Sequence, residues 1–317
     1  MKVLLTGITG NLGSEVARDL RRRGMEVVPI VRPGKRGSLP QCEDGVESDL
    51  TGEGGIEFGG AAEAVVHCAG VVHFQKAGNA NERMMRKVLH LAESLRVPLF
   101  FASTAFVYKP PGNGTSFNNR YEVDKHRAEQ VLSASRVPYA ILRPSVLTGH
   151  SRTGKILNFS GYYALVGAFL NAIRDSAAKD RTLRFPRMTG RSDMVPVDEA
   201  AMRIGDAVQN GRYGTLYVTN PAPPDSQWVL DETLDFFGLR NKADIIDMPF
   251  GEYGKLDLRE EERSIFRFAS HFAPYWSMGY DFPPSTCTRN FIDRDYLART
   301  LAFFRDSEHP IHGYRTY

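Results

Sequence analysis

The chain has 317 residues, of which 42% are hydrophobic and 24% charged, as in an ordinary globular protein. Lys and Arg together number 40 and Asp and Glu 37, so the formal net charge is only +3. This balance gives no reason to expect a nucleic acid or a membrane as a partner. We therefore expect a small-molecule substrate, and the sequence leaves open whether the protein is a monomer or a homodimer.

The cysteines and the apolar stretches indicate the compartment. Cys42, Cys68 and Cys287 lie far apart and form neither a metal-ligand spacing nor a disulfide framework, which fits a reducing cytosol. The apolar start of the chain breaks at Gly7, and the longest apolar stretch, 162–173, is too short to span a bilayer. We expect a cytoplasmic protein without a bound metal.

The first half of the chain alternates short apolar runs with stretches of helical periodicity. A strand at 2–6 is followed by a glycine-rich turn, a helix that ends at Gly24, and a strand at 26–31. The predicted elements that follow are strands near 45–47, 64–69, 98–102 and 139–142 and helices at 81–96 and 121–133. This order predicts an α/β fold with a doubly wound parallel sheet, the Rossmann class.

The turn after the first strand carries glycines with distinct uses. Gly7 permits a tight turn, Gly10 lets the backbone approach a pyrophosphate, and Gly13 lets the helix pack close to the sheet. The free N–H groups of the helix N-terminus then face the phosphates. We interpret the segment as a dinucleotide site because it joins a strand to a helix. The residues expected to bind the cofactor here are Gly7, Thr9, Gly10, Asn11, Leu12 and Gly13.

Tyr121 and Lys125 lie four residues apart on a predicted helix, so their side chains share one face. A phenol with a pKa near ~10 is a poor proton donor at neutral pH. An ammonium group one turn away is expected to stabilise the phenolate and to lower the phenol pKa. The alternative interpretation is an exposed helix face without chemistry.

Several motifs, taken in order, resemble those of the extended short-chain dehydrogenases/reductases. They are Thr6-Gly7-x-x-Gly10-x-x-Gly13, Ser48-Asp49-Leu50, His67-Cys68-Ala69-Gly70, the helix that contains Asn81, Ser103-Thr104-Ala105-Phe106-Val107-Tyr108, Tyr121-x-x-x-Lys125 and Leu142-Arg143-Pro144. The resemblance covers roughly residues 1–235, and the C-terminal part matches only loosely. It implies a Rossmann domain with a smaller C-terminal substrate lobe.

The resemblance also implies a division of the chain. The dinucleotide-binding domain would span 1–150, with returning segments at about 190–240, and the substrate lobe would comprise 151–190 and 241–317. Residues 245–317 hold 15 of the 34 aromatic residues. These side chains either line an apolar substrate pocket or form the core of the lobe, and we favour the core.

Catalytic roles follow from the same resemblance. Tyr121 would exchange a proton as the hydride moves, and Lys125 would tune it and bind the nicotinamide ribose. Thr104 would bond the substrate oxygen, with Ser103 as the alternative. Asn81 either holds a water that relays protons to Lys125 or is a helix N-cap. The remaining implied cofactor contacts are Asp49, Leu50, Ala69 and Pro144.

Arg32 indicates which cofactor is bound. It ends the second strand, where an acidic residue would bind the ribose 2′-hydroxyl of NAD. An arginine there suits a 2′-phosphate, and Lys35 or Arg36 would assist. We therefore expect NADP, with NAD as the alternative. An ordinary solvated loop is the other interpretation of this segment.

The substrate class rests on fewer residues. Ser103-Thr104-Ala105 and residues 150–155 resemble the thioester-reductase and fatty-acyl-reductase branch. No acid follows Thr104 to protonate a leaving hydroxyl, which argues against a sugar dehydratase. We expect an NADP-dependent oxidoreductase that reduces a ketone, an aldehyde or an acyl thioester by hydride transfer. Two alternatives stay open: a nucleotide-sugar epimerase that keeps its cofactor bound, and a non-enzymatic NADP-sensing protein.

Overall fold

The computed structural model describes residues 1–35, 45–72, 78–112 and 116–307. The chain divides into two compact units. Unit 1 comprises Met1–Leu147, Val195–Thr219 and Phe282–Thr288. Unit 2 comprises Thr148–Met194, Asn220–Asp281 and the residues from Arg289 onward.

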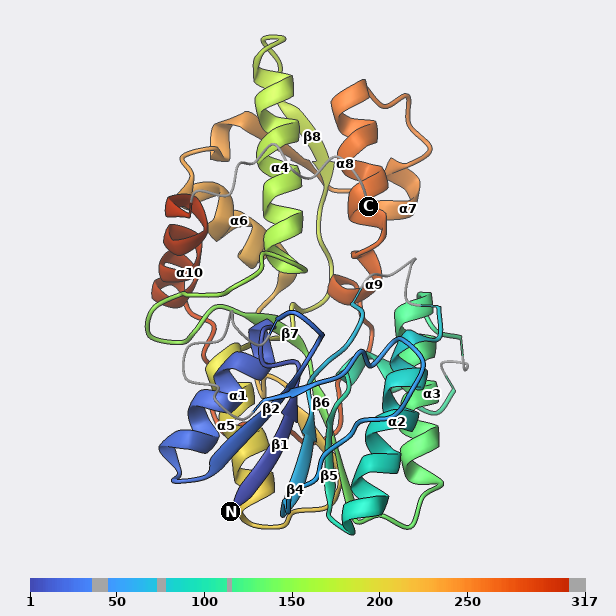
Figure 1. Cartoon of the computed structure of the whole chain (residues 1–317). Coiled ribbons are helices and arrows are strands. Elements are labelled where there is room, and N and C mark those ends of the chain that lie inside the picture. Colours follow the sequence, from blue (N-terminus) through green and yellow to red (C-terminus); the bar gives the residue numbers. More distant parts are fainter. Residues whose placement is uncertain (36–44, 73–77, 113–115, 308–317) are drawn as a thin grey trace. The chain divides into compact units, whose positions relative to one another are not determined.

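Unit 1 contains a seven-stranded parallel sheet within the described part of the chain (Figure 1). The strand order is β10-β6-β5-β4-β1-β2-β3. The strands are β1 (Lys2–Thr6), β2 (Glu26–Val31), β3 (Val46–Glu47), β4 (Ala64–His67), β5 (Leu99–Ala102), β6 (Tyr139–Pro144) and β10 (Gly214–Val218). The order reverses between β1 and β4, which is where ligands bind in open parallel sheets. The predicted Rossmann class is confirmed.

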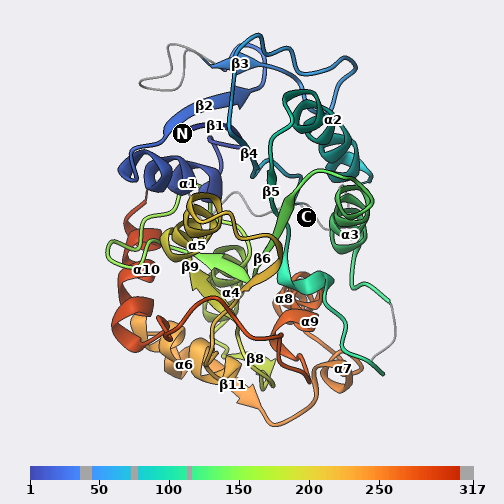
Figure 2. The same cartoon turned by 90° about the horizontal axis from the view of Figure 1, so that it is seen from below.

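Two pairs of helices cover the two faces of this sheet (Figure 2). The first pair is α1 (Asn11–Arg22) and α5 (Val197–Gln209), and the second is α2 (Ala80–Leu95) and α3 (Arg120–Ser133). Leu20 on α1 is fully buried against the first face and Val88 on α2 against the second. Helical periodicity therefore aligns the apolar side chains of each helix with the sheet.

The predicted strands and helices of unit 1 lie within two residues of the observed ones. The returning part of unit 1 differs from the expected 190–240 in two ways: residues 220–240 belong to unit 2, and Phe282–Thr288 belongs to unit 1. Ser285 Oγ donates to Thr219 O at 2.6 Å, and Thr286 N donates to Tyr217 O at 2.8 Å. The chain also forms the short strands β7 (Val146–Thr148) and β9 (Met194–Pro196), which pair with each other.

Unit 2 is mainly helical. Its elements are α4 (Tyr162–Ala177), β8 (Leu183–Pro186), α6 (Ser226–Phe236), η3 (Arg240–Lys242), β11 (Ala243–Ile246), α7 (Phe250–Tyr253), α8 (Glu260–Ser270), α9 (Ala273–Trp276) and α10 (Arg294–Asp306). The strands β8 and β11 pair in parallel.

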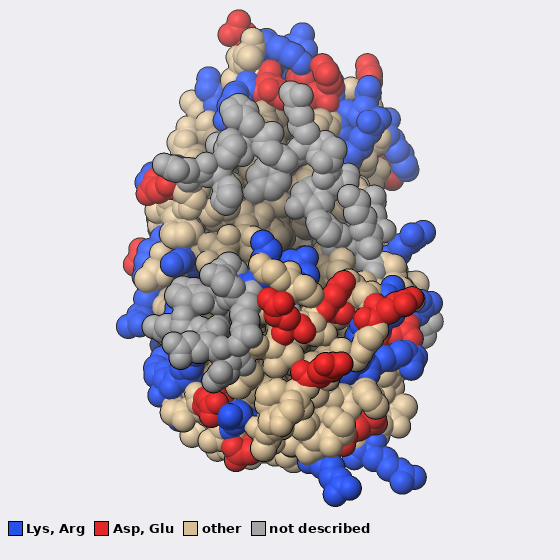
Figure 3. All heavy atoms as spheres, viewed as in Figure 1, with Lys and Arg blue, Asp and Glu red and all other residues tan. Residues whose placement is uncertain are grey.

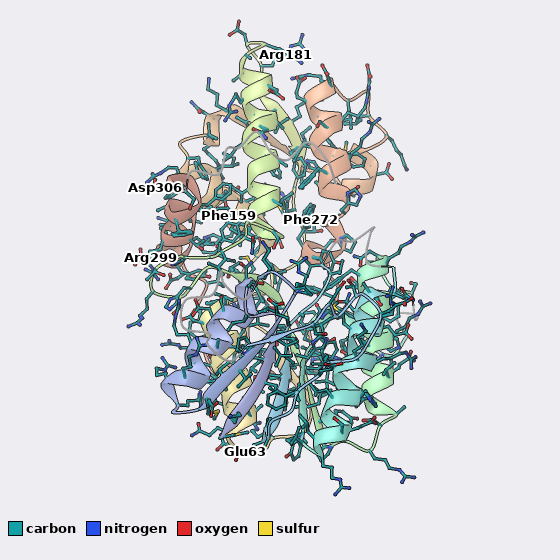
Figure 4. All side chains as sticks on the ribbon, viewed as in Figure 1. Glu63, Phe159, Arg181, Phe272, Arg299 and Asp306 are labelled. Carbon is teal, nitrogen blue, oxygen red and sulfur yellow. The ribbon has the colours of Figure 1, made fainter. Side chains whose placement is uncertain are left out.

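Aromatic side chains build the core of unit 2. Phe250 packs against Phe266 and Trp276, with ring centroids 4.7 and 5.8 Å apart. Phe159 contacts Phe304 of α10 and lies at the opposite end of α4 from Arg181 (Figure 4). At these positions the aromatic enrichment of the C-terminal sequence forms a core, as we favoured.

The surface carries charges of both signs. Basic and acidic side chains are interspersed on the face shown in Figure 3. None of the described helices combines the length and the apolar character needed to cross a membrane.

Candidate active site

A pocket of about 580 Å³ opens in unit 1, lined by residues that directly follow β1, β2, β3 and β4. It lies where the strand order reverses, as expected for a ligand site of this fold. The predicted cofactor residues that line it are Gly7, Thr9, Gly10, Arg32, Asp49, Leu50 and Ala69.

The turn between β1 and α1 forms one wall of the pocket. Gly7 has a φ of +78°, and a Cβ there would lie 2.5 Å from Ala69 N, so only glycine fits. A Cβ at Gly13 would lie 2.1 Å from Gly7 O, so the absence of a side chain lets α1 pack directly on the turn. Gly10 is the N-cap of α1 and supplies no side-chain cap. The first N–H groups of α1 are therefore suited to a phosphate.

Other predicted residues do not line the pocket. Asn11 begins α1, and the side chain of Leu12 packs in the core, so Leu12 can offer a ligand only its backbone. Pro144 is buried as the last residue of β6. Lys125 is connected to the pocket through Gly70, because a Cβ at Gly70 would lie 3.1 Å from Lys125 Nζ.

The loop after β2 brings basic side chains to the pocket. Arg32 and Lys35 both line it and are exposed, and Lys35 N donates to Arg32 O at 3.0 Å. Arg36 lies outside the described residues. Sequence reasoning missed Glu47, whose carboxylate accepts from Gly34 N at 3.2 Å. One acid therefore lies beside the basic loop, although it is not a lining residue.

The turn that contains Asp49 is held by contacts within the turn and by Lys87, which the sequence did not predict. Asp49 Oδ1 accepts from Thr51 N at 2.9 Å and from Thr51 Oγ1 at 2.8 Å, and these bonds lower the Asp49 pKa. Lys87 Nζ, from α2, donates to Asp49 O at 3.0 Å and to Gly52 O at 2.6 Å. Together with the glycine turn, this wall fits a dinucleotide.

Tyr121 and Thr104 meet at the end of β5. Tyr121 lies in the first turn of α3, where Asn119 is the N-cap and accepts from Glu122 N at 3.0 Å. The side chains of Tyr121 and Thr104 are hydrogen-bonded to each other. Among the described residues, Ser103 Oγ is buried and has no hydrogen-bond partner. Thr104, rather than Ser103, is therefore the hydroxyl paired with Tyr121.

The ionisation of Tyr121 differs from the sequence-based expectation. Burial raises the pKa of Tyr121, the hydrogen bond between Tyr121 and Thr104 lowers it, and the charge of Glu122 raises it. Lys125 is not among the described groups that shift this pKa, so the expected lowering by its ammonium group is wrong for this structure. Burial is the largest influence on this pKa. Lys125 Nζ donates to Ala102 O at 2.9 Å and lies 4.7 Å from the centroid of the Phe101 ring.

Lys125 itself is deeply buried, with 3% of its surface exposed. Burial lowers its pKa to about 8, while Cys68, Glu129 and Asp124 raise it. The amine is therefore still mostly charged at neutral pH. It can donate three hydrogen bonds, and one of them goes to Ala102 O.

Asn81 is buried in the first turn of α2. The N-cap of this helix is Asn79, so the interpretation of Asn81 as the N-cap is wrong. Asn81 Oδ1 accepts from Val71 N at 2.9 Å, and Asn81 Nδ2 donates to Val71 O at 3.1 Å. The side chain thus holds the pocket wall at Val71. Its role in a proton relay stays a prediction.

The sequence and the fold of this chain were compared with those of known proteins. Residues 7–163 match a family described as NAD(P)H-binding. This part of the chain is similar to NAD(P)H-binding domains. Among the curated proteins, no relative matches the chain.

Solved structures extend the likeness in fold over most of the chain. The terminal R domain of the myxalamid PKS-NRPS pathway has a TM-score of 0.65 and 19% identity, covering 95% of this chain and 90% of that one. The thiolation-reductase di-domain of an archaeal non-ribosomal peptide synthetase has a TM-score of 0.67 and 17% identity, covering 96% and 75%. UDP-N-acetylglucosamine 4-epimerase from Bacillus cereus has a TM-score of 0.57 and 17% identity, covering 90% and 99%. The predicted resemblance to extended short-chain dehydrogenases/reductases is confirmed at the level of the fold.

Proposed function

We propose that the protein is an NADP-dependent reductase that transfers a hydride to the carbonyl of a ketone, an aldehyde or an acyl thioester. The proposal rests on one observation: Tyr121 and Thr104 are hydrogen-bonded at the end of β5. Lys125, on the same helix as Tyr121, donates to Ala102 O of that strand and adjoins Gly70 of the pocket. A paired hydroxyl and phenol next to a dinucleotide pocket suit carbonyl chemistry.

The nicotinamide cofactor supplies the hydride when it is bound. Because their side chains are hydrogen-bonded to each other, the hydroxyls of Tyr121 and Thr104 would bond one substrate oxygen between them. Burial raises the pKa of Tyr121, so the phenol keeps its proton at neutral pH and donates it as negative charge develops on that oxygen. Thr104 stabilises the same charge by a second hydrogen bond.

Three further groups would hold the cofactor. The N–H groups at the start of α1 would bind the pyrophosphate, as at other helix N-termini. The Lys125 ammonium, still charged at neutral pH, would donate to the ribose hydroxyls. Arg32 and Lys35 would pair with a 2′-phosphate, which is why we favour NADP over NAD.

The first test is a substrate screen with the purified protein. NADPH oxidation is followed with aldehydes, ketones, acyl thioesters and nucleotide sugars, and we expect turnover with one carbonyl class. Tyr121→Phe should lower that turnover by about 100-fold or more, because it removes the proton donor, while the Kd of NADPH changes little.

Tyr213→Phe is the matched control, since Tyr213 is an exposed tyrosine of unit 1 and its loss should leave turnover unchanged. Full turnover in Tyr121→Phe would contradict the proposal. Conversion of a nucleotide sugar without net NADPH consumption would indicate the epimerase alternative. Tight NADPH binding without turnover of any compound would indicate the sensor.

A further inference from the structure

Asp124 precedes Lys125 on α3 and is fully buried. Its carboxylate faces the start of α2: Oδ2 accepts from Asn81 N at 2.8 Å, and Oδ1 accepts from Glu82 N at 3.1 Å. The N-cap residue Asn79 makes no side-chain cap of its own. Asp124 therefore caps α2 from a neighbouring helix, where a negative charge is favoured by the helix dipole.

A third bond orients the Asn81 side chain. Asn81 Nδ2 donates to Asp124 Oδ2 at 2.9 Å. An ionised carboxylate can only accept hydrogen bonds, so Asn81 must present its NH₂ group to Asp124. The amide oxygen then points away, and it accepts from Val71 N at 2.9 Å. The carboxylate thus determines which way the Asn81 amide faces.

The oriented amide reaches the cofactor pocket. Val71 and Gly70 both line the pocket. A Cβ at Gly70 would lie 3.1 Å from Asn81 Oδ1 and equally 3.1 Å from Lys125 Nζ, so these two atoms flank the same point of the wall. Asp124, Asn81 and Val71 form a continuous chain of hydrogen bonds from α3 to the pocket.

We propose that Asp124 is a positioning residue of the cofactor site, which fixes the pocket wall through Asn81 without itself touching the cofactor. The inference rests on the proposed function, because it assigns Asp124 a role in NADPH binding. Neither the motifs nor the fold comparison assigns any role to Asp124.

The charge of Asp124 also acts on Lys125. Within the described part of the chain, the titratable groups that act on this amine are Glu129 and Asp124 on its own helix and His67 and Cys68 at the end of β4. Asp124 is one of those that raise the Lys125 pKa. Its replacement by a neutral residue lowers that pKa further, so Lys125 loses its proton at a lower pH than in the wild type.

Asp124→Asn tests both roles through NADPH binding, which needs no substrate. We expect the Kd of NADPH at pH 7 to rise by about tenfold, the loss typical of one hydrogen bond to a charged group. As the pH is raised, the affinity for NADPH should begin to fall at a lower pH than in the wild type. A purely structural role of Asp124 would not produce this shift. Asn81→Ala should raise the Kd similarly, and the double variant should be no worse than either single one, because both break the same chain.

Asp225→Asn is the control, since Asp225 caps α6 of unit 2 with the same chemistry and should leave the Kd unchanged. An unchanged Kd in Asp124→Asn, or additive losses in the double variant, would overturn the proposal. If Asp124→Asn does not fold, Asn81→Ala becomes the deciding variant, because Asp124 still accepts from the backbone N–H groups of residues 81 and 82 in that variant. An unchanged Kd of NADPH in Asn81→Ala would then overturn the proposal. A wild-type protein that binds no nicotinamide dinucleotide would overturn the proposed function itself, and this inference with it.

Discussion

Burial controls the ionisation of the two central side chains at the scale of single residues. It raises the pKa of Tyr121 and lowers that of Lys125 to about 8. At neutral pH the phenol therefore keeps its proton, while the amine is still mostly charged. Reduction of a carbonyl requires a proton donor rather than a phenolate, so this pattern suits the reductive direction.

A second proposal at the scale of single residues is that Arg32 sets the preference for NADP over NAD. Arg32→Ala should raise the Kd of NADPH tenfold or more, because a charged hydrogen bond to the 2′-phosphate contributes about 1.5–3 kcal/mol. The Kd of NADH should change by less than about twofold, since NADH has no such phosphate. Both cofactors are titrated on the same preparation. Arg21→Ala, in the last turn of α1 and outside the pocket lining, is the control. Equal weakening of both cofactors would rule out the NADP assignment.

The elements of unit 1 are positioned by close backbone packing. Helix α1 lies directly on the turn after β1, because Gly13 has no side chain to hold the two apart. In the proposed cofactor site the first N–H groups of α1 would bind the pyrophosphate. We therefore expect a change in the packing of this helix to affect cofactor binding as well.

Gly13→Ala tests this coupling. The new Cβ would lie 2.1 Å from Gly7 O, so α1 must shift. We expect a loss of about 1–3 kcal/mol in the free energy of unfolding, the usual result of overpacking, together with a higher Kd for NADPH. At Gly59 an added Cβ meets nothing within 4 Å, so Gly59→Ala is the matched control in thermal denaturation. If both variants melt alike, the packing argument is wrong.

The sequence predicts the elements better than the contacts between them. Strands β1 and β2 and the glycine turn are local patterns, so their bounds and the bent backbone at Gly7 follow from residue order alone. Periodicity indicates the buried face of α3 but not the atom that Lys125 Nζ reaches. The bonds from Asn81 to Asp124 and from Lys87 to Asp49 join residues 43 and 38 positions apart, and no local pattern encodes such pairs.

At the scale of the whole molecule, each of the two units is built from several separate segments of the chain. Unit 1 takes α5 and β10 from Val195–Thr219 and a further segment from Phe282–Thr288. Ala200 and Ile204 of α5 are buried against the sheet, and β10 pairs with β6. The returning segments thus complete a domain that the first 147 residues only begin.

A fragment of residues 1–147 should therefore fail to fold cooperatively. Without α5, one face of the sheet is uncovered, and without β10 the edge of β6 is unpaired, which exposes apolar surface and promotes aggregation. Thermal denaturation by circular dichroism, with the full chain as the reference, measures the outcome. A cooperative transition with NADPH affinity equal to that of the full chain would contradict this view of the fold.

The most direct test of the central claim follows the hydride itself. The purified protein is incubated with NADPH deuterated at the transferable position and with the carbonyl compound found in the screen, and the product is analysed by mass spectrometry. We predict one deuterium on the former carbonyl carbon, formed by the wild type and by Tyr213→Phe and almost lost in Tyr121→Phe. A product without deuterium, or one formed equally fast by Tyr121→Phe, would contradict hydride transfer at the Tyr121–Thr104 site.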